Sequence, residues 1–360
     1  MSQSTPGNVP RVGSSVAIGI LGMHRSGTSA LTRVLNLLGV ELGDHLCPAR
    51  RDNPTGFWED ERIVQIHDQI LDALGSRCND ILPSPDGWVD NPAIRPKRQE
   101  LLNLIKSDFA DRPLWGFKDP RACRVVPLWE GLLRELNVSP RFVLTIRQPI
   151  EIARSLAVRS GHSLNKSLLL TLTHMLSAEA DTRAYPRLIV NFDQLFADWR
   201  GTVDRIARSL GLRWPIDPQQ AGPAIEEFLN PQMRHHYVRR DVAPDLDPWA
   251  GADPAVVAWV RAQYRILCSA AEGTGKVDTA ALDQINAEFK YAIPRLRPWR
   301  ESKGWEYAEF SEFIVHENQR LKAEVERLNR ELERQPSAGR SQGNQSVNTN
   351  LSSSGTRPSN

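Results

Sequence analysis

The stretch Gly22-Met-His-Arg-Ser-Gly-Thr-Ser29 constrains this chain more than any other part of it. It follows an apolar run over 16–21, short enough for a buried strand, and precedes a helical pattern over 30–38 that ends at Gly39. A strand, a glycine-bearing turn and a helix in succession point several backbone N–H groups at an anion. Arg25 adds a permanent positive charge inside the turn. The sequence therefore predicts a cradle for the 5′ phosphate end of a nucleotide-like donor.

The turn matches the P-loop pattern G-x-x-x-x-G-K-[ST] except at the lysine. Gly22 and Gly27 supply the glycines, and Ser29 supplies the final hydroxyl. Thr28 occupies the position of the lysine that grips phosphate in P-loop enzymes. A kinase or another phosphoryl transferase is therefore an alternative that Thr28 disfavours. The structural alternative is a strand-to-helix turn with packing glycines and a surface arginine.

Strands and helices alternate along the rest of the chain. Runs rich in β-forming residues predict strands over 113–118, 141–146 and 187–192. The expected helices are one that begins after residue 60 and others over about 94–110, 150–158, 164–184, 194–210, 253–272 and 278–290. Residues 211–250 are predicted to be irregular because they are rich in proline. The alternation predicts an α/β, P-loop-like three-layer fold with a mostly parallel central sheet flanked by helices.

Polar side chains follow each of the predicted strands. Arg25, Lys118, Arg147 and Asp193 all come just past a strand. In parallel sheets, ligands bind at the carboxyl ends of the strands. We therefore expect these residues to share one site, with Asp193 also capping the helix over 194–210.

The segment Arg25-Ser-Gly-Thr-Ser29 resembles the loop (K/R)-S-G-T-(T/S) of the sulfotransferase superfamily. The resemblance covers about residues 15–240, and arginine at the first position is similar to the tyrosylprotein sulfotransferases and many bacterial members. In that family the loop binds the 5′-phosphosulfate of 3′-phosphoadenosine 5′-phosphosulfate (PAPS). The residues that the resemblance assigns to this end of PAPS are Gly22, Arg25, Ser26, Gly27, Thr28 and Ser29.

A second pair resembles the family's site for the 3′-phosphate of PAPS. Arg147 ends a predicted strand, and Ser155 follows eight residues later on the next helix, as in that family. A planar guanidinium gives a forked, charge-assisted grip on phosphate oxygens, and a helical serine adds a neutral donor. The alternative is a surface arginine and a serine that is satisfied by its own helix backbone.

Glu59 is the candidate general base. The family has a Glu or His downstream of the first helix that faces the sulfuryl group, and Glu59 fits that description. Burial beside Phe57 and Trp58 would raise the pKa of Glu59 toward the working range of a base. The alternative is a glutamate favoured by a helix dipole, which also fits Asp60 and Glu61. The rival bases are His24, His45 and His67.

Lys118 is the second candidate catalytic residue. Lys118-Asp-Pro-Arg121 is similar to a Lys-Asp-Pro of the tyrosylprotein enzymes, whose lysine contacts the transferring group. The resemblance implies that Lys118 and Arg25 stabilise charge on the sulfonate and the leaving phosphate. It leaves open whether Arg121 binds donor or acceptor. The structural alternative pairs Lys118 with Asp119 at the strand end.

Composition excludes several other classes. The 360 residues carry a net charge of only +2, which does not favour binding to nucleic acid. No apolar run reaches the length of about 18 residues that a membrane helix needs. The four cysteines are scattered and indicate neither a zinc site nor a disulfide framework, so reduced thiols in a cytoplasm are expected. The resemblance implies no metal cofactor.

The two ends of the chain are expected to differ from the domain over 15–300. Residues 1–14 are predicted to be a disordered leader without a signal peptide, and 336–360 a disordered tail. A heptad pattern containing Asn318 predicts a coiled coil over 306–334, through which two copies would form a homodimer. The alternative is a single amphipathic helix docked on the domain.

Together these observations predict a PAPS-dependent sulfotransferase. The acceptor is expected to be a hydroxyl on a carbohydrate or glycoconjugate, by analogy with the family alone. The basic stretch over 234–240 is expected either to cover the nucleotide or to be a solvated loop. Besides the phosphoryl transferase, the alternative is a non-enzymatic assembly protein with a coiled coil and a vestigial nucleotide site.

Overall fold

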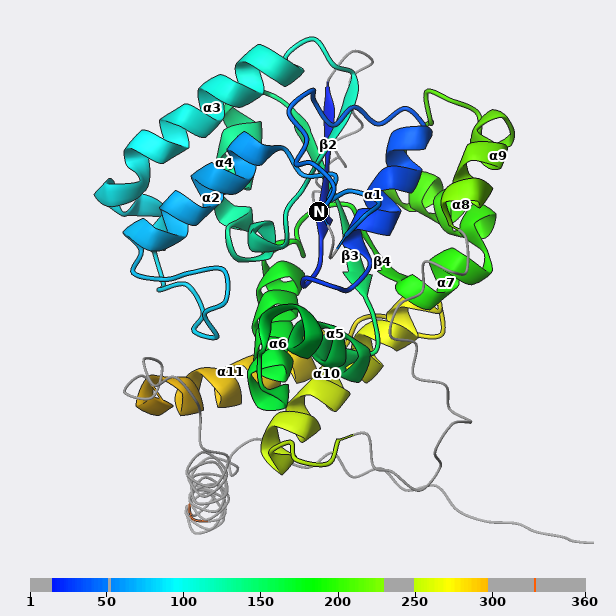
Figure 1. Ribbon diagram of the computed structural model, residues 1–360. Helices are drawn as coiled ribbons and strands as arrows, with labels where there is room; N and C mark the ends of the chain where they lie inside the picture. Colours follow the sequence, from blue (N-terminus) through cyan, green and yellow to red (C-terminus); the bar gives the residue numbers. More distant parts are fainter. Residues whose placement is uncertain (1–14, 51–52, 230–248, 297–326, 328–360) are drawn as a thin grey trace, which may run out of the picture. The chain divides into compact units, whose positions relative to one another are not determined.

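A computed structural model shows that the strands form a four-stranded sheet in the order β2-β1-β3-β4, with each neighbouring pair parallel (Figure 1). The structure describes residues 15–50, 53–229, 249–296 and 327. The strands are β1 Val16–Leu21, β2 Leu114–Lys118, β3 Ser139–Ile146 and β4 Arg187–Asn191. The predicted α/β fold with a mostly parallel sheet is therefore confirmed.

Helices pack on both faces of this sheet (Figure 1). One face is covered by α1 Thr28–Leu37, α7 Phe192–Ala197, α8 Trp199–Leu210 and α9 Pro218–Phe228. The other helices are α2 Glu61–Ala73, α3 Arg95–Phe109, α4 Val126–Glu135, α5 Pro149–Ser160, α6 Leu164–Asp181, α10 Pro254–Ala271 and α11 Thr279–Leu296. Short 3₁₀ turns cover Trp88–Asp90, Pro92–Ile94 and Pro120–Arg124.

The core explains why the strands are continuous apolar runs. A parallel sheet between two helical layers is buried on both faces, so polar alternation is lost. On one face, Ile18 and Val143 pack against α1 and α8. On β2, Phe117 stacks on Trp129 of α4 with ring centroids 3.6 Å apart. Gly19 of β1 lies between aromatic rings of its neighbouring strands, where a Cβ atom would come within 2.9 Å of either ring.

Two local predictions are wrong. Asp193 does not cap a helix over 194–210: Asn191 accepts the N–H of Asp193, and the helix divides in two at Asp198. Residues 211–250 are not wholly irregular, because α9 begins behind the cap Asp217, with Pro218 at its first position. An acidic cap followed by proline is a helix-start signal that the proline-rich composition hid.

Some predicted segments lie outside the described residues. These are the leader over 1–14, the basic stretch over 234–240, the coiled coil over 306–334 apart from Arg327, and the tail over 336–360.

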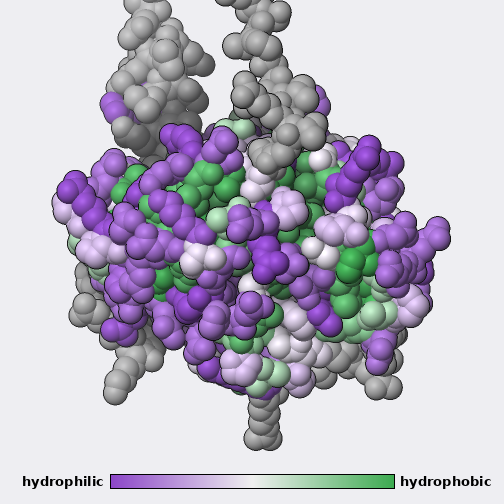
Figure 2. All heavy atoms as spheres, turned by 90° about the horizontal axis from the view of Figure 1, so that it is seen from above, coloured by the Kyte–Doolittle hydropathy of each residue, from purple (hydrophilic) through white to green (hydrophobic). Residues whose placement is uncertain are grey.

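The chain divides into two compact units, Met1–Glu312 and Phe313–Asn360. In the described part of the chain, no helix is long and apolar enough to cross a membrane. The face seen from above in Figure 2 is mainly hydrophilic, with apolar residues among the polar ones.

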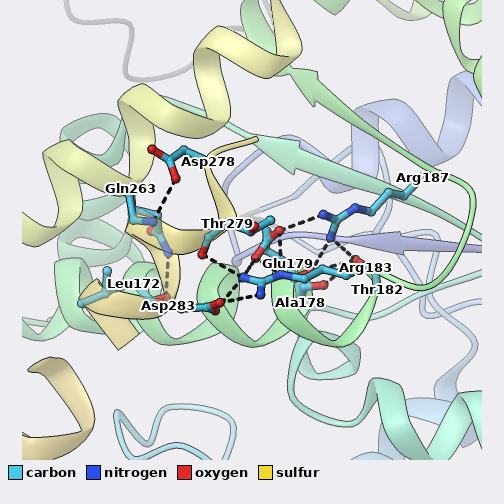
Figure 3. Close-up of polar contacts among 11 residues, drawn as sticks. Leu172, Ala178, Glu179, Thr182, Arg183, Arg187, Gln263, Asp278, Thr279 and Asp283 are labelled. Atoms are coloured by element: carbon cyan, nitrogen blue, oxygen red, sulfur yellow. Dashed lines mark hydrogen bonds and ion pairs between the residues drawn. The ribbon is translucent and has the colours of Figure 1, made fainter. Parts of the chain in front are cut away.

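A buried carboxylate ties β4 to α6 (Figure 3). The side chain of Glu179 is 1% exposed and accepts from Arg183 at 2.7 Å and from Arg187 at 2.8 Å. Arg187 is the first residue of β4, and Arg183 also pairs with Asp283 of α11 at 2.8 Å. One carboxylate therefore fixes the start of β4 against two helices.

Glu179→Ala should lower the free energy of unfolding by about 3 kcal/mol, because it leaves two partly buried guanidiniums without their shared partner. Urea denaturation measures this. Asp283→Ala is the matched control: its carboxylate is exposed, so a much smaller loss is expected. Equal losses in the two variants would contradict a role for burial.

Candidate active site

Three of the residues predicted at strand ends line one cavity at the carboxyl edge of the sheet. Arg25, Lys118 and Arg147 face this cavity, which we call the donor cavity. Asp193 is not among its lining residues, and the neighbouring Phe192 lines it instead. The donor cavity therefore brings together groups from the ends of β1, β2 and β3.

The turn after β1 is shaped by two glycines that have no room for a side chain. Gly27 adopts a φ of 96°, and a Cβ atom there would lie 2.1 Å from the Phe192 ring. A Cβ atom on Gly22 would lie 2.2 Å from the hydroxyl of Thr145 on β3. Arg25 also has a left-handed backbone, with φ 71°. Such conformations in non-glycine residues cluster at ligand sites because surrounding structure must impose them.

The first turn of α1 faces the donor cavity. Gly27 is its N-cap residue, and no side chain caps the helix. Thr28, Ser29 and Ala30 line the cavity. Since the first N–H groups of a helix have no partner within the helix, they can bind an anion there.

Gly22 and Ser26 support the turn from behind. Neither lines the donor cavity. Ser26 is 1% exposed, and its hydroxyl lies 3.1 Å from that of Thr145, which donates to the carbonyl of Leu21. The side chain of Ser26 therefore holds the turn against β3.

The two predicted phosphate motifs meet. Arg25 Nε donates to Ser155 Oγ at 2.7 Å, and Arg147 Nη1 donates to the carbonyl of Arg25 at 3.3 Å. Arg147 Nε also pairs with Glu151 at 2.8 Å, and its guanidinium lies 4.7 Å from the Phe192 ring centroid. Both guanidiniums are thus held in place by other groups of the protein. Glu151 was not predicted, although its i, i+4 spacing from Arg147 is a usable signal.

Glu59 and Lys118 form a buried ion pair. Lys118 Nζ lies 2.5 Å from Glu59 Oε1 and also donates to the Phe57 carbonyl at 3.0 Å and to Ser29 Oγ at 3.1 Å. The side chain of Glu59 is 9% exposed, and that of Lys118 is 2% exposed. Burial raises the pKa of Glu59, and the charge of Lys118 offsets part of that rise. Both candidate catalytic residues line the donor cavity.

Asp119 is the centre of a separate buried network of hydrogen bonds. The alternative that pairs Asp119 with Lys118 is therefore wrong. His67 Nε2 accepts from Trp129 at 2.9 Å, so its other nitrogen carries a proton and donates to Asp119 at 2.7 Å. The other oxygen of Asp119 accepts from Arg121 at 2.9 Å. Burial alone would raise the pKa of Asp119, but Arg121 and His67 outweigh it and hold that pKa below its ordinary value.

The three rival bases differ in burial and in whether they line the donor cavity. His67 is fully buried and does not line the donor cavity. His45 is exposed and lies outside the cavity lining too, whereas His24 lines the cavity. Burial, followed by the charge of Arg121, lowers the pKa of His24 well below its ordinary value. Among the residues that the structure describes, no group of three or more His, Cys, Asp or Glu residues could hold a metal ion.

Comparison with known proteins gives matches among solved structures only. No family model and no curated protein matches the chain. Sulfotransferase STF1 from Mycobacterium tuberculosis H37Rv is 19% identical with a TM-score of 0.41, over 59% of this chain and 71% of that one. The sulfotransferase domain from the curacin biosynthetic pathway is 15% identical with a TM-score of 0.32, over 59% and 77%.

The sulfotransferase domain from the Synechococcus PCC 7002 olefin synthase is 14% identical with a TM-score of 0.32, over 79% of this chain and 92% of that one. These identities and TM-scores are too low to carry an argument about activity, which must come from the site itself. All three of these solved structures are described as sulfotransferases or sulfotransferase domains.

Proposed function

We propose that this chain transfers a sulfuryl group from PAPS to a hydroxyl group of an acceptor. One observation carries the proposal: two oriented guanidiniums and an uncapped helix start line the same cavity as a buried Glu–Lys pair. The cations and the helix start suit a donor with two anionic ends, and the carboxylate suits removal of a proton from an alcohol.

The residues present fit the two ends of PAPS. The N–H groups at the start of α1, together with Arg25, would hold the 5′-phosphosulfate. Arg147 would hold the 3′-phosphate. Ser155, which was predicted to assist it, is 1% exposed, does not line the donor cavity and accepts a hydrogen bond from Arg25. Two features support the site for the 5′-phosphosulfate: no side chain caps the helix, and the Phe192 ring packs against Gly27 where a Cβ atom would lie, so the turn needs a glycine there.

Glu59 is proposed to accept the proton of the acceptor hydroxyl. Its Oε1 is held by Lys118, while no hydrogen bond to its Oε2 is seen from the described residues. The raised pKa of Glu59 moves its basicity toward neutral pH, where a general base is most effective. Lys118 holds the carboxylate in place, so its free oxygen can face the acceptor.

Charge balance follows from the same residues. PAPS would supply the sulfuryl group. As the hydroxyl proton moves to Glu59, the acceptor oxygen forms a bond to sulfur, and the bond from sulfur to the bridging phosphate oxygen breaks. Arg25, Lys118 and the N–H groups at the start of α1 are positioned to stabilise the charge that the leaving phosphate gains.

A thermal-shift experiment tests the donor. Adenosine 3′,5′-bisphosphate (PAP) at about 100 times its dissociation constant should stabilise the protein by about 2.7 kcal/mol. ATP with Mg²⁺ should give a much smaller shift, because Thr28 replaces the phosphate-gripping lysine. Stabilisation by ATP and Mg²⁺ alone would instead support a phosphoryl transferase. Radiolabelled PAPS with a panel of glycans then tests the proposed carbohydrate acceptor.

A further inference from the structure

A second cavity adjoins the donor cavity, and the two share His24 and Arg159. Its lining comes from five segments: the turn after β1, the loop after α2, the turn after β2, the end of α5 with the residues that follow it, and α6. Arg121, Asn79 and His162 are among its polar lining residues. An open volume next to the site of transfer is where an acceptor can place the part of its structure that does not react.

The polar lining of the second cavity consists largely of nitrogen donors. Two guanidiniums, two imidazoles and an amide line it, and none of its lining residues is an Asp or Glu. The Nδ1 atom of His162 is buried and makes no hydrogen bond within the described part of the chain. A buried polar nitrogen without a partner is costly, so a ligand that bonds to it would be stabilised.

Arg121 is held in a fixed position. Its Nε donates to Asp68 at 2.6 Å, and its Nη1 donates to Asp119 at 2.9 Å. These two bonds leave Nη2 with no hydrogen bond to any described residue. Nη2 of this fixed, charged group can therefore donate to an oxyanion.

Two carboxylates, Asp68 and Asp119, pair with Arg121, and neither lines the second cavity. Asp119 is buried and offsets one guanidinium charge, whereas Asp68 is 43% exposed and screened by solvent. Arg159 adds a second guanidinium.

We propose that the second cavity binds an anionic group of the acceptor, either a carboxylate or a phosphate or sulfate ester, through Arg121, Arg159 and His162. The inference rests on the proposed function, since the donor cavity must hold PAPS for its neighbour to hold the acceptor. It narrows the acceptor from any alcohol to one that carries an oxyanion near the reacting hydroxyl.

Calorimetry on the complex with saturating PAP tests this, because PAP occupies the nucleotide part of the donor cavity and leaves the second cavity open. Methyl phosphate, methyl sulfate and glucuronate represent the ester and carboxylate forms, and glucose is the neutral control. We expect at least one anion to bind saturably while glucose does not. The class that binds more tightly identifies the anionic group. No saturable binding by any of the three anions would overturn the inference.

Variants on α5 locate the binding. Arg159→Gln should weaken binding of the anion to the PAP complex about tenfold, because it removes one charge-assisted hydrogen bond. Arg154→Gln is the matched control: Arg154 is exposed on the same helix and lines neither cavity, so no change is expected. Equal affinities in the two variants would overturn the inference.

Further controls separate the two proposals. Arg121→Lys keeps the charge but loses the planar guanidinium and its Nη2 donor, and it should weaken binding of the anion as well. The PAP affinity of each variant is measured first, since Arg159 also lines the donor cavity. Failure of the wild type to bind PAP would contradict the proposed function. PAP binding without anion binding would contradict only the assignment of the second cavity.

Discussion

Replacing Arg147 by alanine should weaken PAP binding about 100-fold, because a forked, charge-assisted grip on a phosphate is lost. Arg147 is 7% exposed, lines the donor cavity and is already oriented by Glu151 and Phe192. Little ordering of this side chain is needed on binding, so its full contribution should be measurable. Calorimetry with PAP gives the two affinities directly.

The variant needs a control, since Arg147→Ala leaves the buried carboxylate of Glu151 without its cation. The double variant Arg147→Ala/Glu151→Ala removes both charges and should regain stability but not PAP affinity. Recovery of PAP affinity in the double variant would mean that the stranded carboxylate, and not the missing guanidinium, caused the loss. Equal PAP affinities for the wild type and Arg147→Ala would reject the assignment outright.

Glu59→Gln should remove turnover and spare donor binding. A general base contributes about 10²- to 10⁴-fold to rate, so kcat should fall by about 10³-fold while the PAP affinity changes little. Glutamine keeps the shape of the side chain and can still accept the hydrogen bond from Lys118. Initial rates with radiolabelled PAPS, together with PAP calorimetry, separate the two effects.

The pH profile provides a second readout for Glu59. Because burial raises its pKa, the wild-type rate should fall as the pH drops through that raised value and the carboxylate becomes protonated. The residual rate of Glu59→Gln should lack this limb. Glu61→Gln is the control, since Glu61 is exposed at the start of α2. If Glu59→Gln kept the wild-type kcat, another group would have to be the general base, and His24 would be the first candidate to test.

Those parts of the fold that depend on local sequence were predicted well. β1 and β3 are apolar runs bounded by charged or glycine-bearing turns, and a parallel sheet buries such runs on both faces. The capping error at Asp193 shows the limit of local signals. Asn191 and Asp193 are both suitable caps, and which one acts depends on where β4 ends, which neighbouring strands decide.

The residues of the site were predicted from the sequence, but most of the contacts between them were not. Arg25, Arg147 and Ser155 were named from their resemblance to sulfotransferase motifs, and the structure brings them together. The pairing of Glu59 with Lys118 could not be predicted, because it depends on β2 lying beside β1 and on the path of the loop before α2. Their roles toward PAPS and the acceptor stay predictions.

Lys118 also joins separate parts of the fold. An ammonium group has only three N–H bonds, and those of Lys118 reach Ser29 in α1, the carbonyl of Phe57 and the carboxylate of Glu59. Replacing Lys118 would remove at once the contacts that join the end of β2 to the start of α1 and to the loop before α2. Loss of activity in a Lys118 variant would therefore indicate a catalytic role only if the structure around the site were first shown to be intact.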